Sequence, residues 1–457
     1  MSGNLRTDQF FNLKYHIKTF GCQMNKHDSE RIAGMLESLG ALPVDTIEES
    51  DLVVFMTCCV REAADVRLIG QVSSMKNIPL REGSPVSKRI IAIGGCIGQR
   101  DGQKLLDDLD HVDVVFGTNN LASLPSLLDS AINDHERLAE TVEESTMFPT
   151  ELPTVREHQW AAWLPITIGC NNFCTYCIVP YVRGREKSRP FEDVVKEAQS
   201  YVAAGVKEIT LLGQNVNSYG RDLYGKPRFA DMLEAVAETG IERIRFATSH
   251  PKDLTDEVIE KFATLPNLMP ALHLPAQAGS NRVLKAMHRV YTIEHYRELV
   301  AKLREACPGI ALSTDIIVGF PGETEEDFEG TYQLVKDMGY SQVFTFIYSK
   351  REGTPAAKMV DNTPRSVIQE RFDRLREVVE KGAYDYNQAS LGKTLPVLIE
   401  GYSKKEQSIL TGRSPENITV HVEAPEGFNA QDYVGKILDV GIDEAKTWYL
   451  RGHFDNA

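Results

Sequence analysis

Short runs of apolar residues alternate with amphipathic stretches through the first third of the chain. The runs have the length and the β-branched content of buried strands, and they cover residues 15–20, 51–57, 89–94 and 112–117. Stretches with helical periodicity, such as HDSERIAGMLESLG, lie between them. Strands that alternate with helices are typical of a parallel sheet covered on both faces. Residues 14–131 are therefore predicted to form a doubly wound α/β domain.

A second series of strand and helix patterns begins near residue 164. Its apolar runs cover 164–169, 208–213, 244–248, 271–275, 311–319 and 342–348. Six such units in succession predict a partial (β/α)6 barrel. The barrel domain is expected over 156–388 and ends in a long charged helix at about 364–388. The polar, acidic stretch 132–155 has no clear period and is interpreted as a linker.

The pattern changes once more after residue 388. Short β-like runs such as TLPVLIEG, SILTGRS and ITVHVE alternate with Gly, Ser, Pro and Asn. This spacing predicts a small β-barrel over 389–456. The fold class expected from the sequence is thus α/β multidomain, with a doubly wound sheet, a partial barrel and a small all-β domain.

Composition narrows the class of protein. With 457 residues, 42% of them apolar and 25% charged, the chain resembles a globular enzyme. No stretch approaches the roughly 20 apolar residues that span a bilayer, and the N-terminal sequence lacks the features of a secretory signal. We therefore expect a cytoplasmic protein without membrane contact. The net charge of −15 provides no overall basic footprint for nucleic acid, although a local patch would suffice.

The chain has eight cysteines. In a reducing compartment, spaced cysteines indicate metal binding or catalysis rather than disulfide bonds. Cys170, Cys174 and Cys177 have a C-x3-C-x2-C spacing directly after the first strand of the predicted barrel. Soft thiolate ligands suit iron–sulfur clusters or zinc. A structural zinc site requires four ligands, and no fourth lies nearby in the sequence. Three thiolates with one open position are what a reaction centre needs.

Three further cysteines share one position in the predicted N-terminal sheet. Cys22, Cys58 and Cys96 each follow the end of a predicted strand. In open parallel sheets, ligands bind beyond the carboxyl ends of the strands. The three thiols are therefore expected to converge on a second cluster site, and the glycines at 21, 94 and 95 allow close approach of the backbone.

The central motif resembles that of the radical S-adenosylmethionine enzymes, including Tyr176 before the last cysteine. The resemblance implies a [4Fe-4S] cluster whose free iron binds S-adenosylmethionine. It also implies cleavage of that cofactor to methionine and a 5′-deoxyadenosyl radical. Polar residues at the strand ends and after the motif are candidates for holding the cofactor; they are Tyr176, Arg183, Gln214, Asn215, Ser249, Gln277 and Asp315. Helix caps and turns are the alternative role of these residues.

The segments TFGCQMNKHDSE, TCCVRE and GGC closely resemble the N-terminal domain of the methylthiotransferases within that superfamily. The resemblance implies a second [4Fe-4S] cluster on Cys22, Cys58 and Cys96. The family pattern has a small residue after its second cysteine, whereas this chain has Cys59. Alignment to the preceding threonine assigns Cys58 as the ligand. Cys307 is expected to pack at a helix end.

Within the family, the runs RIRFATSHPKDL, LHLPAQAGS and STDIIVGFPGETEEDF resemble the branch that acts on N6-isopentenyladenosine beside the tRNA anticodon. The implied reaction replaces the C2 hydrogen with a methylthio group. The implied partners are the tRNA anticodon loop and a reducing electron donor such as flavodoxin or ferredoxin, and the chain is expected to be a monomer. The last segment resembles the TRAM domain, an RNA-binding β-barrel.

That segment lacks an overall basic footprint, because residues 389–457 hold seven Lys or Arg against ten Asp or Glu. A local patch at Lys404, Lys405 and Arg413 is the candidate for phosphate contact. Tyr402 and Trp448 could stack on bases, although core packing is the expected role of Trp448. The alternatives are a sister enzyme acting on another tRNA base or a ribosomal-protein aspartate, and a two-cluster redox protein that binds RNA without modifying it.

Overall fold

The computed structural model describes residues 6–59, 62–143, 148, 152–403, 406, 408–424 and 432–454. The backbone divides into two compact units. The first unit consists of Met1–Glu157, Ile168–Phe173 and Cys177–Lys187, and the second of His158–Thr167, Cys174–Tyr176 and Ser188–Ala457. Within the described residues, no helix is both long and apolar enough to cross a membrane.

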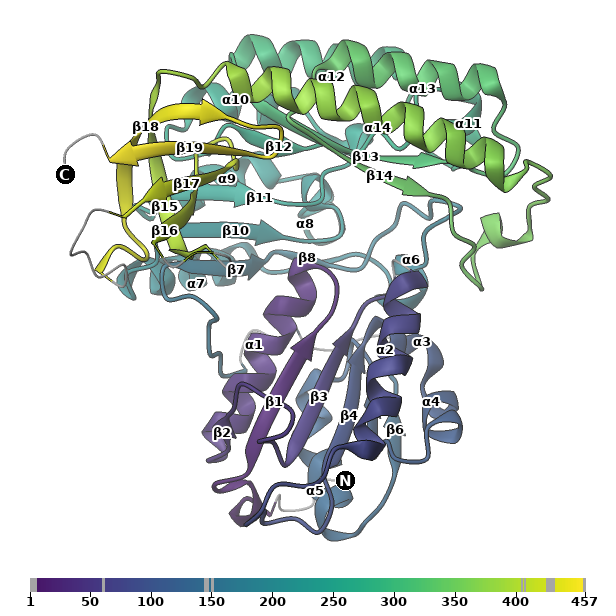
Figure 1. The fold of residues 1–457 in the computed structure, drawn as a ribbon, viewed down its shortest axis with the longest axis vertical. Coiled ribbons are helices and arrows are strands. Elements are labelled where there is room, and N and C mark those ends of the chain that lie inside the picture. The colour runs from purple at the N-terminus through teal and green to yellow at the C-terminus, as the bar shows by residue number, and fades with distance from the viewer. Residues whose placement is uncertain are drawn as a thin grey trace. The chain divides into compact units, whose positions relative to one another are not determined.

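The first unit is built on a parallel six-stranded sheet in the order β2-β1-β3-β4-β5-β6 (Figure 1). Its strands are β1 (Lys14–Thr19), β2 (Leu42–Pro43), β3 (Leu52–Thr57), β4 (Ile90–Gly95), β5 (Val114–Phe116) and β6 (Leu138–Glu140). Its helices are α1 (Gln23–Ser38), α2 (Glu62–Ser74), α3 (Cys96–Asp101), α4 (Gln103–Asp108), α5 (Leu124–Asn133) and α6 (Val179–Val182).

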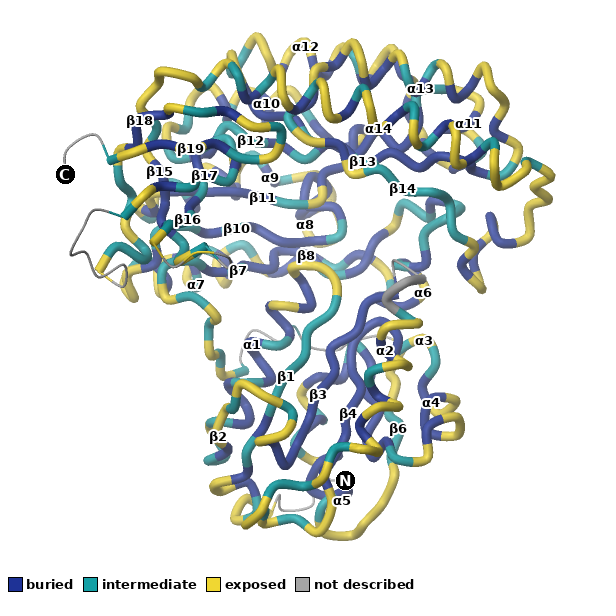
Figure 2. The backbone as a smooth tube through the Cα atoms, in the orientation of Figure 1, coloured by how far each residue is buried: buried dark blue, intermediate teal, exposed yellow. Residues whose placement is uncertain are grey.

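Alternate residues of the central strands supply two separate cores. Val54 packs with apolar residues of α1 and α5, whereas its neighbours Val53 and Phe55 pack with α2, α3 and α4. Strands β3 and β4 are consequently buried along their whole lengths (Figure 2). A strand covered on both faces needs an unbroken apolar sequence, which explains why these runs were visible in the sequence.

The second unit carries six parallel strands in two hydrogen-bonded ladders, β7-β10-β11 and β12-β13-β14. The strands are β7 (Ala161–Pro165), β10 (Glu208–Leu212), β11 (Arg243–Phe246), β12 (Ala271–His273), β13 (Ala311–Val318) and β14 (Gln342–Ile347). A short pair, β8 (Thr167–Ile168) and β9 (Lys187–Ser188), lies beside the cysteine motif in the sequence. A single bridge between Ile244 and Leu268 extends β11 toward the second ladder.

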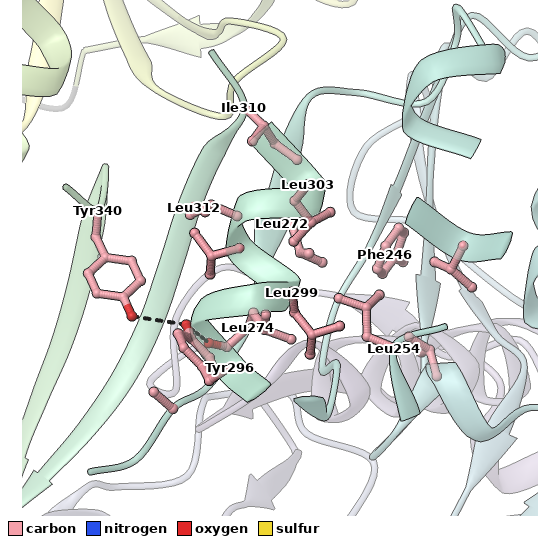
Figure 3. Close-up of a cluster of buried hydrophobic side chains, with 14 of the residues drawn as sticks. Phe246, Leu254, Leu272, Leu274, Tyr296, Leu299, Leu303, Ile310, Leu312 and Tyr340 are labelled. Carbon is pink, nitrogen blue, oxygen red and sulfur yellow. Dashed lines mark hydrogen bonds between the residues drawn. The ribbon is translucent and has the colours of Figure 1, made fainter. Parts of the chain in front are cut away.

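Helices follow the strands of this unit. They are α7 (Phe191–Ala203), α8 (Arg221–Tyr224), α9 (Phe229–Ala237), α10 (Asp256–Thr264), α11 (Asn281–Ala286), α12 (Ile293–Ala306), α13 (Glu325–Met338) and α14 (Arg365–Gln388). All of them except α8 contribute buried residues to one core with the strands. Figure 3 shows part of this core, in which Leu272, Leu299 and Leu303 pack together. The Tyr340 hydroxyl lies 3.0 Å from that of Tyr296, so both buried phenols are satisfied.

The C-terminal strands of the second unit close into a barrel in the order β15-β16-β17-β19-β18. They are β15 (Thr394–Tyr402), β16 (Ile409–Arg413), β17 (Thr419–Glu423), β18 (Ile437–Ala445) and β19 (Tyr449–Phe454). Two buried arginines of β11 donate to main-chain carbonyls of this barrel. Arg243 reaches Arg413, and Arg245 reaches Ser414 and Pro415, over 2.9 to 3.1 Å. The barrel therefore satisfies buried charges of the second unit.

The predicted fold class is confirmed, and the structure adds two edge strands. Strand β2 has only two residues, and β6 lies inside the segment that was expected to be an irregular linker. All three residues of β6 are half-buried, so its sequence does not carry the apolar run that identified the central strands. The long helix predicted near 364–388 is α14.

A buried carboxylate links the glycine-rich turn after β13 to α14. Glu323 accepts a hydrogen bond from the Gly319 amide at 2.8 Å and lies 3.4 Å from Nη1 of Arg371. Burial raises the pKa of Glu323 to about 7 despite these two donors. The folded state therefore binds the proton of Glu323 more tightly than the unfolded state does. This group's contribution to the free energy of unfolding is fully present below pH 4.5 and is lost as pH rises through about 7.

We expect Glu323→Gln to flatten the fall in stability between pH 4.5 and pH 7. At about 1.4 kcal/mol per pKa unit, the effect is on the order of 3 kcal/mol. Thermal unfolding of the purified protein across this pH range measures it. Glu329→Gln is the control, because Glu329 is exposed and pairs with Arg374 on the same helix pair. Equal pH profiles for the wild type and Glu323→Gln would contradict this assignment.

Candidate functional site

Three cysteines of the first unit meet at the carboxyl edge of its sheet. Cys58 and Cys96 directly follow β3 and β4, and Cys22 precedes α1 shortly after β1. These three strands are neighbours, in the order β1-β3-β4. Cys22 and Cys58 are joined by a side-chain hydrogen bond. The three cysteines thus follow the ends of neighbouring strands, with Cys58 and Cys96 buried and Cys22 exposed.

Two glycines allow the strand ends to approach this closely. At Gly21, where φ is +107°, a Cβ atom would lie 2.2 Å from the Cβ of Cys58 and 2.9 Å from its sulfur. At Gly95, where φ is +87°, a Cβ atom would lie 2.5 Å from the carbonyl oxygen of Thr57. Both positions therefore exclude any side chain.

The surroundings of the thiols favour the thiolate at two of them. A hydrogen bond from Cys58 and the positive charge of Arg183 lower the pKa of Cys22 to about 5. A hydrogen bond from Cys59, with the charge of Arg183, lowers the pKa of Cys96 to about 7. The same bond to Cys96, together with burial, raises the pKa of Cys59. Since metals bind the thiolate, Cys22 and Cys96 have the electrostatic character of ligands, whereas Cys59 donates a hydrogen bond to Cys96.

The central motif holds its cysteines in a loop fixed at several points. Cys170 and Cys174 are buried and Cys177 is half-buried. In the first unit, the amide of Cys170 donates to the carbonyl of Gly184 at 3.1 Å. In the second unit, Thr175 donates through its amide to Met287 at 3.0 Å. Its hydroxyl also donates to the Ala286 carbonyl at 2.9 Å.

Polar groups at the carboxyl ends of β10 and β11 are joined to one another. The amide of Val216 donates to the Thr248 carbonyl at 3.1 Å, and the His250 amide donates to Asn217 at the same distance. Several buried polar atoms here have no hydrogen-bond partner; they are Oε1 of Gln214, Oδ1 of Asn215, Nδ2 of Asn217 and Oγ of Ser249. Buried polar groups are normally satisfied, so these atoms fit a polar ligand at the strand ends.

The other candidates lie in several environments. The main chain of Gln277 hydrogen-bonds that of β13. Both Gln277 and Thr248, which follows β11, have φ of +70°. Residues with such strained backbone cluster at functional sites. Asp315 lies 3.5 Å from His273. Tyr176 packs against the core of the second unit. Arg183 is buried in the first unit, where it contacts Asn25, Asp28 and Cys96.

The donor chemistry of both cysteine sets fits an iron–sulfur cluster, because every candidate ligand is a soft sulfur donor. Within the described ranges, no three His, Cys, Asp or Glu side chains are gathered as a formed metal site. In the first unit the thiols are instead paired, Cys22 with Cys58 and Cys59 with Cys96. Ligation by Cys22, Cys58 and Cys96 would replace these thiol contacts with bonds to iron.

Known proteins match the chain over three segments and along its whole length. Family models match residues 14–117 (an uncharacterized protein family), 164–335 (the radical SAM superfamily) and 388–454 (the TRAM domain). A tRNA-2-methylthio-N(6)-dimethylallyladenosine synthase of Carboxydothermus hydrogenoformans is 47% identical over 441 residues, which cover 96% of this chain and 98% of the relative. The synthase of Streptomyces coelicolor is also 47% identical, over 95% of this chain and 86% of its own.

The chain belongs to the methylthiotransferase family of radical S-adenosylmethionine enzymes.

Solved structures share the fold of this methylthiotransferase at low sequence identity. The radical S-adenosylmethionine methyltransferase TsrM from Kitasatospora setae has a TM-score of 0.54 at 14% identity, covering 76% of this chain and 74% of its own. The cobalamin-dependent radical enzyme OxsB has a TM-score of 0.51 at 14% identity, covering 82% of this chain and 58% of its own. Both likenesses concern the fold alone.

The structure of the methylthiotransferase corrects one expectation and extends others. Trp448 was expected in the barrel core, but it is 50% exposed. Tyr402 is also exposed, whereas Lys404 and Lys405 lie outside the described residues. Cys307 packs at the C-terminal end of α12, as expected.

Sequence reasoning missed Arg289, which donates to the sulfur of Cys174. The two residues are 115 positions apart, and Arg289 carries no local motif. Reasoning from sequence also treated Cys59 as a substitute for a small residue, although it hydrogen-bonds Cys96. Neither contact leaves a periodic signal in the sequence.

We expect Gly21→Ala to remove the cluster of the first unit, because the added methyl group would overlap Cys58. The control is Gly83→Ala, which also has positive φ but would meet no atom within 4 Å. It should lose only about 1–2 kcal/mol of stability through backbone strain. Iron and sulfide per chain measure the difference. Equal iron in the two variants would show that close packing at Gly21 does not build the site.

Proposed function

We propose that this chain is a tRNA methylthiotransferase that replaces the C2 hydrogen of N6-isopentenyladenosine beside the anticodon with a methylthio group. The observation that carries the proposal is the identity of 46–47% with curated synthases of that name over at least 95% of the chain. The two cysteine sets support it, since the reaction needs sulfur and a means of attacking an unactivated carbon–hydrogen bond.

Two [4Fe-4S] clusters and S-adenosylmethionine are the cofactors. Cys170, Cys174 and Cys177 would hold the cluster that binds S-adenosylmethionine, and Cys22, Cys58 and Cys96 would hold the second cluster. Bound at the first cluster, S-adenosylmethionine supplies the radical that removes the C2 hydrogen, a step that acid–base chemistry does not offer. The chain's own task is to bind, orient and exclude water from these groups.

The strand-end groups of the second unit would orient S-adenosylmethionine. The unsatisfied oxygens of Gln214, Asn215 and Ser249 can accept hydrogen bonds from its amino group or its ribose hydroxyls. Tyr176, Gln277 and Asp315 complete the candidate set. The amide of Gln277, which follows β12, donates to the carbonyl of Asp315 in β13. Arg183 is better placed to act on the cysteines of the first unit, where its described partners lie.

The substrate is tRNA, read at an unpaired base of the anticodon loop that can be turned into the site at low cost. The other assignments extend this function. We infer a reducing donor such as flavodoxin or ferredoxin, a monomeric enzyme, and action in the cytoplasm, where tRNA is modified. The domains would be residues 14–131 for the second cluster, 132–155 as linker, 156–388 for the radical core and 389–456 for RNA binding.

The test is nucleoside analysis of tRNA from a strain that lacks this protein. Mass spectrometry should show N6-isopentenyladenosine without its methylthio group, and re-expression should restore the methylthiolated form. Restoration of a different methylthiolated tRNA base, or of a modified ribosomal-protein aspartate, would assign the chain to a sister enzyme. Absence of S-adenosylmethionine cleavage by the reduced protein would favour an RNA-binding redox protein.

The two cysteine sets should separate two activities. Alanine at Cys170, Cys174 and Cys177 should abolish 5′-deoxyadenosine formation, because the cluster iron that would bind S-adenosylmethionine is lost. Alanine at Cys22, Cys58 and Cys96 should leave that cleavage while the methylthiolated product disappears. Cys59→Ser should retain product. Chromatography of deoxyadenosine and of digested tRNA measures both, and retained cleavage in the first variant would contradict the assignment.

The C-terminal barrel should bind tRNA through its surface. Charge reversal at Lys404 and Lys405 should weaken tRNA binding and reduce its dependence on salt, because each phosphate that is no longer neutralised lowers the slope by about 0.7–0.9. Trp448→Ala should weaken binding by roughly 1–3 kcal/mol without changing the slope, because its exposed ring can stack on a base.

Charge reversal at Lys381, an exposed residue of α14, is the matched control. Substitution is preferable to deletion of the barrel, since deletion would leave the buried Arg243 and Arg245 without their carbonyl acceptors. Unchanged affinity in all barrel variants would mean that the tRNA is bound elsewhere on the chain.

A further inference from the structure

Each of the two cysteine sets has one buried arginine hydrogen-bonded to one of its sulfurs. Arg289 is 7% exposed, and its Nη1 lies 3.7 Å from the sulfur of Cys174. Arg183 is also 7% exposed and hydrogen-bonds the thiol of Cys96. The two pairs belong to different units of the chain, so each arrangement stands on its own contacts.

Neutral groups hold Arg289 in place. Its Nη2 donates to the carbonyl of Pro275 at 2.8 Å, and its Nε donates to the hydroxyl of Tyr291 at 3.0 Å. His250, whose ring lies 5.7 Å from that of Tyr291, remains uncharged, because burial and then the charge of Arg289 lower its pKa to about 2. The hydrogen bonds of Thr175 to Ala286 and Met287 keep this segment beside Cys174.

No described Asp or Glu forms an ion pair with Arg289, whose described partners are the Tyr291 hydroxyl, the Pro275 carbonyl and the sulfur of Cys174. A buried, unpaired guanidinium is costly unless an anion lies beside it. Cys174 would be that anion, because its sulfur becomes a thiolate when it binds iron. The positive charge of Arg289 is therefore directed at the cluster ligand rather than at a structural partner.

Arg183 has a different charge balance. Its Nη2 donates to Oδ1 of Asn25 at 2.8 Å and lies 3.3 Å from a carboxylate oxygen of Asp28, which itself contacts His27. Asp28 neutralises part of the guanidinium charge. Arg289 has no such carboxylate partner among the described residues, so we expect more of its charge to act on its cysteine than is the case for Arg183.

We propose that Arg289 and Arg183 are positioning residues that each raise the reduction potential of their own cluster, Arg289 more strongly than Arg183. The inference rests on the cluster assignment of the proposed function. Reduction adds one electron to a cluster, and a nearby positive charge stabilises the more negative state. Hydrogen bonds to cluster sulfurs and local charge are established influences on such potentials. Arg289 would thereby ease electron entry into the cluster that binds S-adenosylmethionine.

Potentiometric titration followed by electron paramagnetic resonance tests this in proteins with one cluster. Alanine at Cys22, Cys58 and Cys96 leaves the cluster beside Arg289, and alanine at Cys170, Cys174 and Cys177 leaves the one beside Arg183. Arg289→Gln should shift the first potential to a more negative value, and Arg183→Gln should shift the second by a smaller amount. Arg289→Lys and Arg183→Lys keep the charge and should recover part of each shift.

The matched control is Arg297→Gln, because Arg297 is half-buried on α12, pairs with Asp337 and has no described contact with a cysteine. It should leave both potentials unchanged. The titrations are made without S-adenosylmethionine or tRNA, so they do not depend on product formation. Methylthiolation of tRNA is measured separately, in the wild type that keeps both cysteine sets. Unmoved potentials together with methylthiolation by the wild type would overturn this inference alone, and shifted potentials together with a wild type that does not methylthiolate would overturn the proposed function alone.

Two further results would overturn the inference. If Arg289→Gln weakened binding of S-adenosylmethionine and left the potential unchanged, Arg289 would be a ligand for the cofactor's carboxylate. If Gln and Lys at position 289 both abolished iron binding, Arg289 would be needed to build the site rather than to set its potential. Iron content of each variant, measured first, separates these outcomes.

Discussion

The carboxyl ends of neighbouring strands in a parallel sheet lie along one edge, and the chemistry of the first unit depends on this constraint. Cys22, Cys58 and Cys96 are far apart in the sequence, yet β1, β3 and β4 are adjacent and parallel. The sheet itself is held by two apolar cores, one on each face. Burial of those faces fixes the register of the strands, and the register places the three cysteines along one edge of the sheet.

The second unit applies the same constraint to polar ligands. Groups after β10 and β11 hydrogen-bond across adjacent strand ends, and several buried polar atoms there are left for a ligand to satisfy. Strained backbone at Thr248 and Gln277 occurs at the same ends of β11 and β12. Such strain is held by the surrounding structure and is typical of functional sites. Close packing of the strands therefore supports strained local geometry at the candidate binding site.

Buried arginines connect the parts of each unit. Arg243 and Arg245 satisfy the C-terminal barrel, Arg371 contacts the Glu323 turn, and Arg289 contacts a cluster cysteine. The planar guanidinium donates several hydrogen bonds at fixed angles, which suits it to main-chain carbonyls and sulfur alike. In this chain the same side chain both holds structure together and places positive charge beside metal ligands.

The elements visible in the sequence were those whose burial on both faces required unbroken apolar runs. Strands β3 and β4 match their predicted runs closely for this reason. The half-buried edge strand β6 carried no such run and lay in the predicted linker. The cysteine positions could be inferred because they follow strand ends.

Contacts between distant side chains could not be inferred from the sequence. The bond between Arg289 and Cys174 and the thiol contact of Cys59 depend on how loops pack, which no local pattern encodes. The exposure of Trp448 is a similar case, because an aromatic residue at a strand end of a small barrel can face either side. The sequence therefore indicated the candidate ligands but not the side chains that contact them.

The central claim is that the chain holds two separate clusters, each on three thiolates. Mössbauer spectroscopy and iron analysis of anaerobically prepared protein measure this directly. We expect two cluster equivalents per chain in the wild type, and one in each variant in which one of the two cysteine sets is replaced. A wild type that saturates with one cluster, or loss of both clusters when either set is replaced, would contradict it.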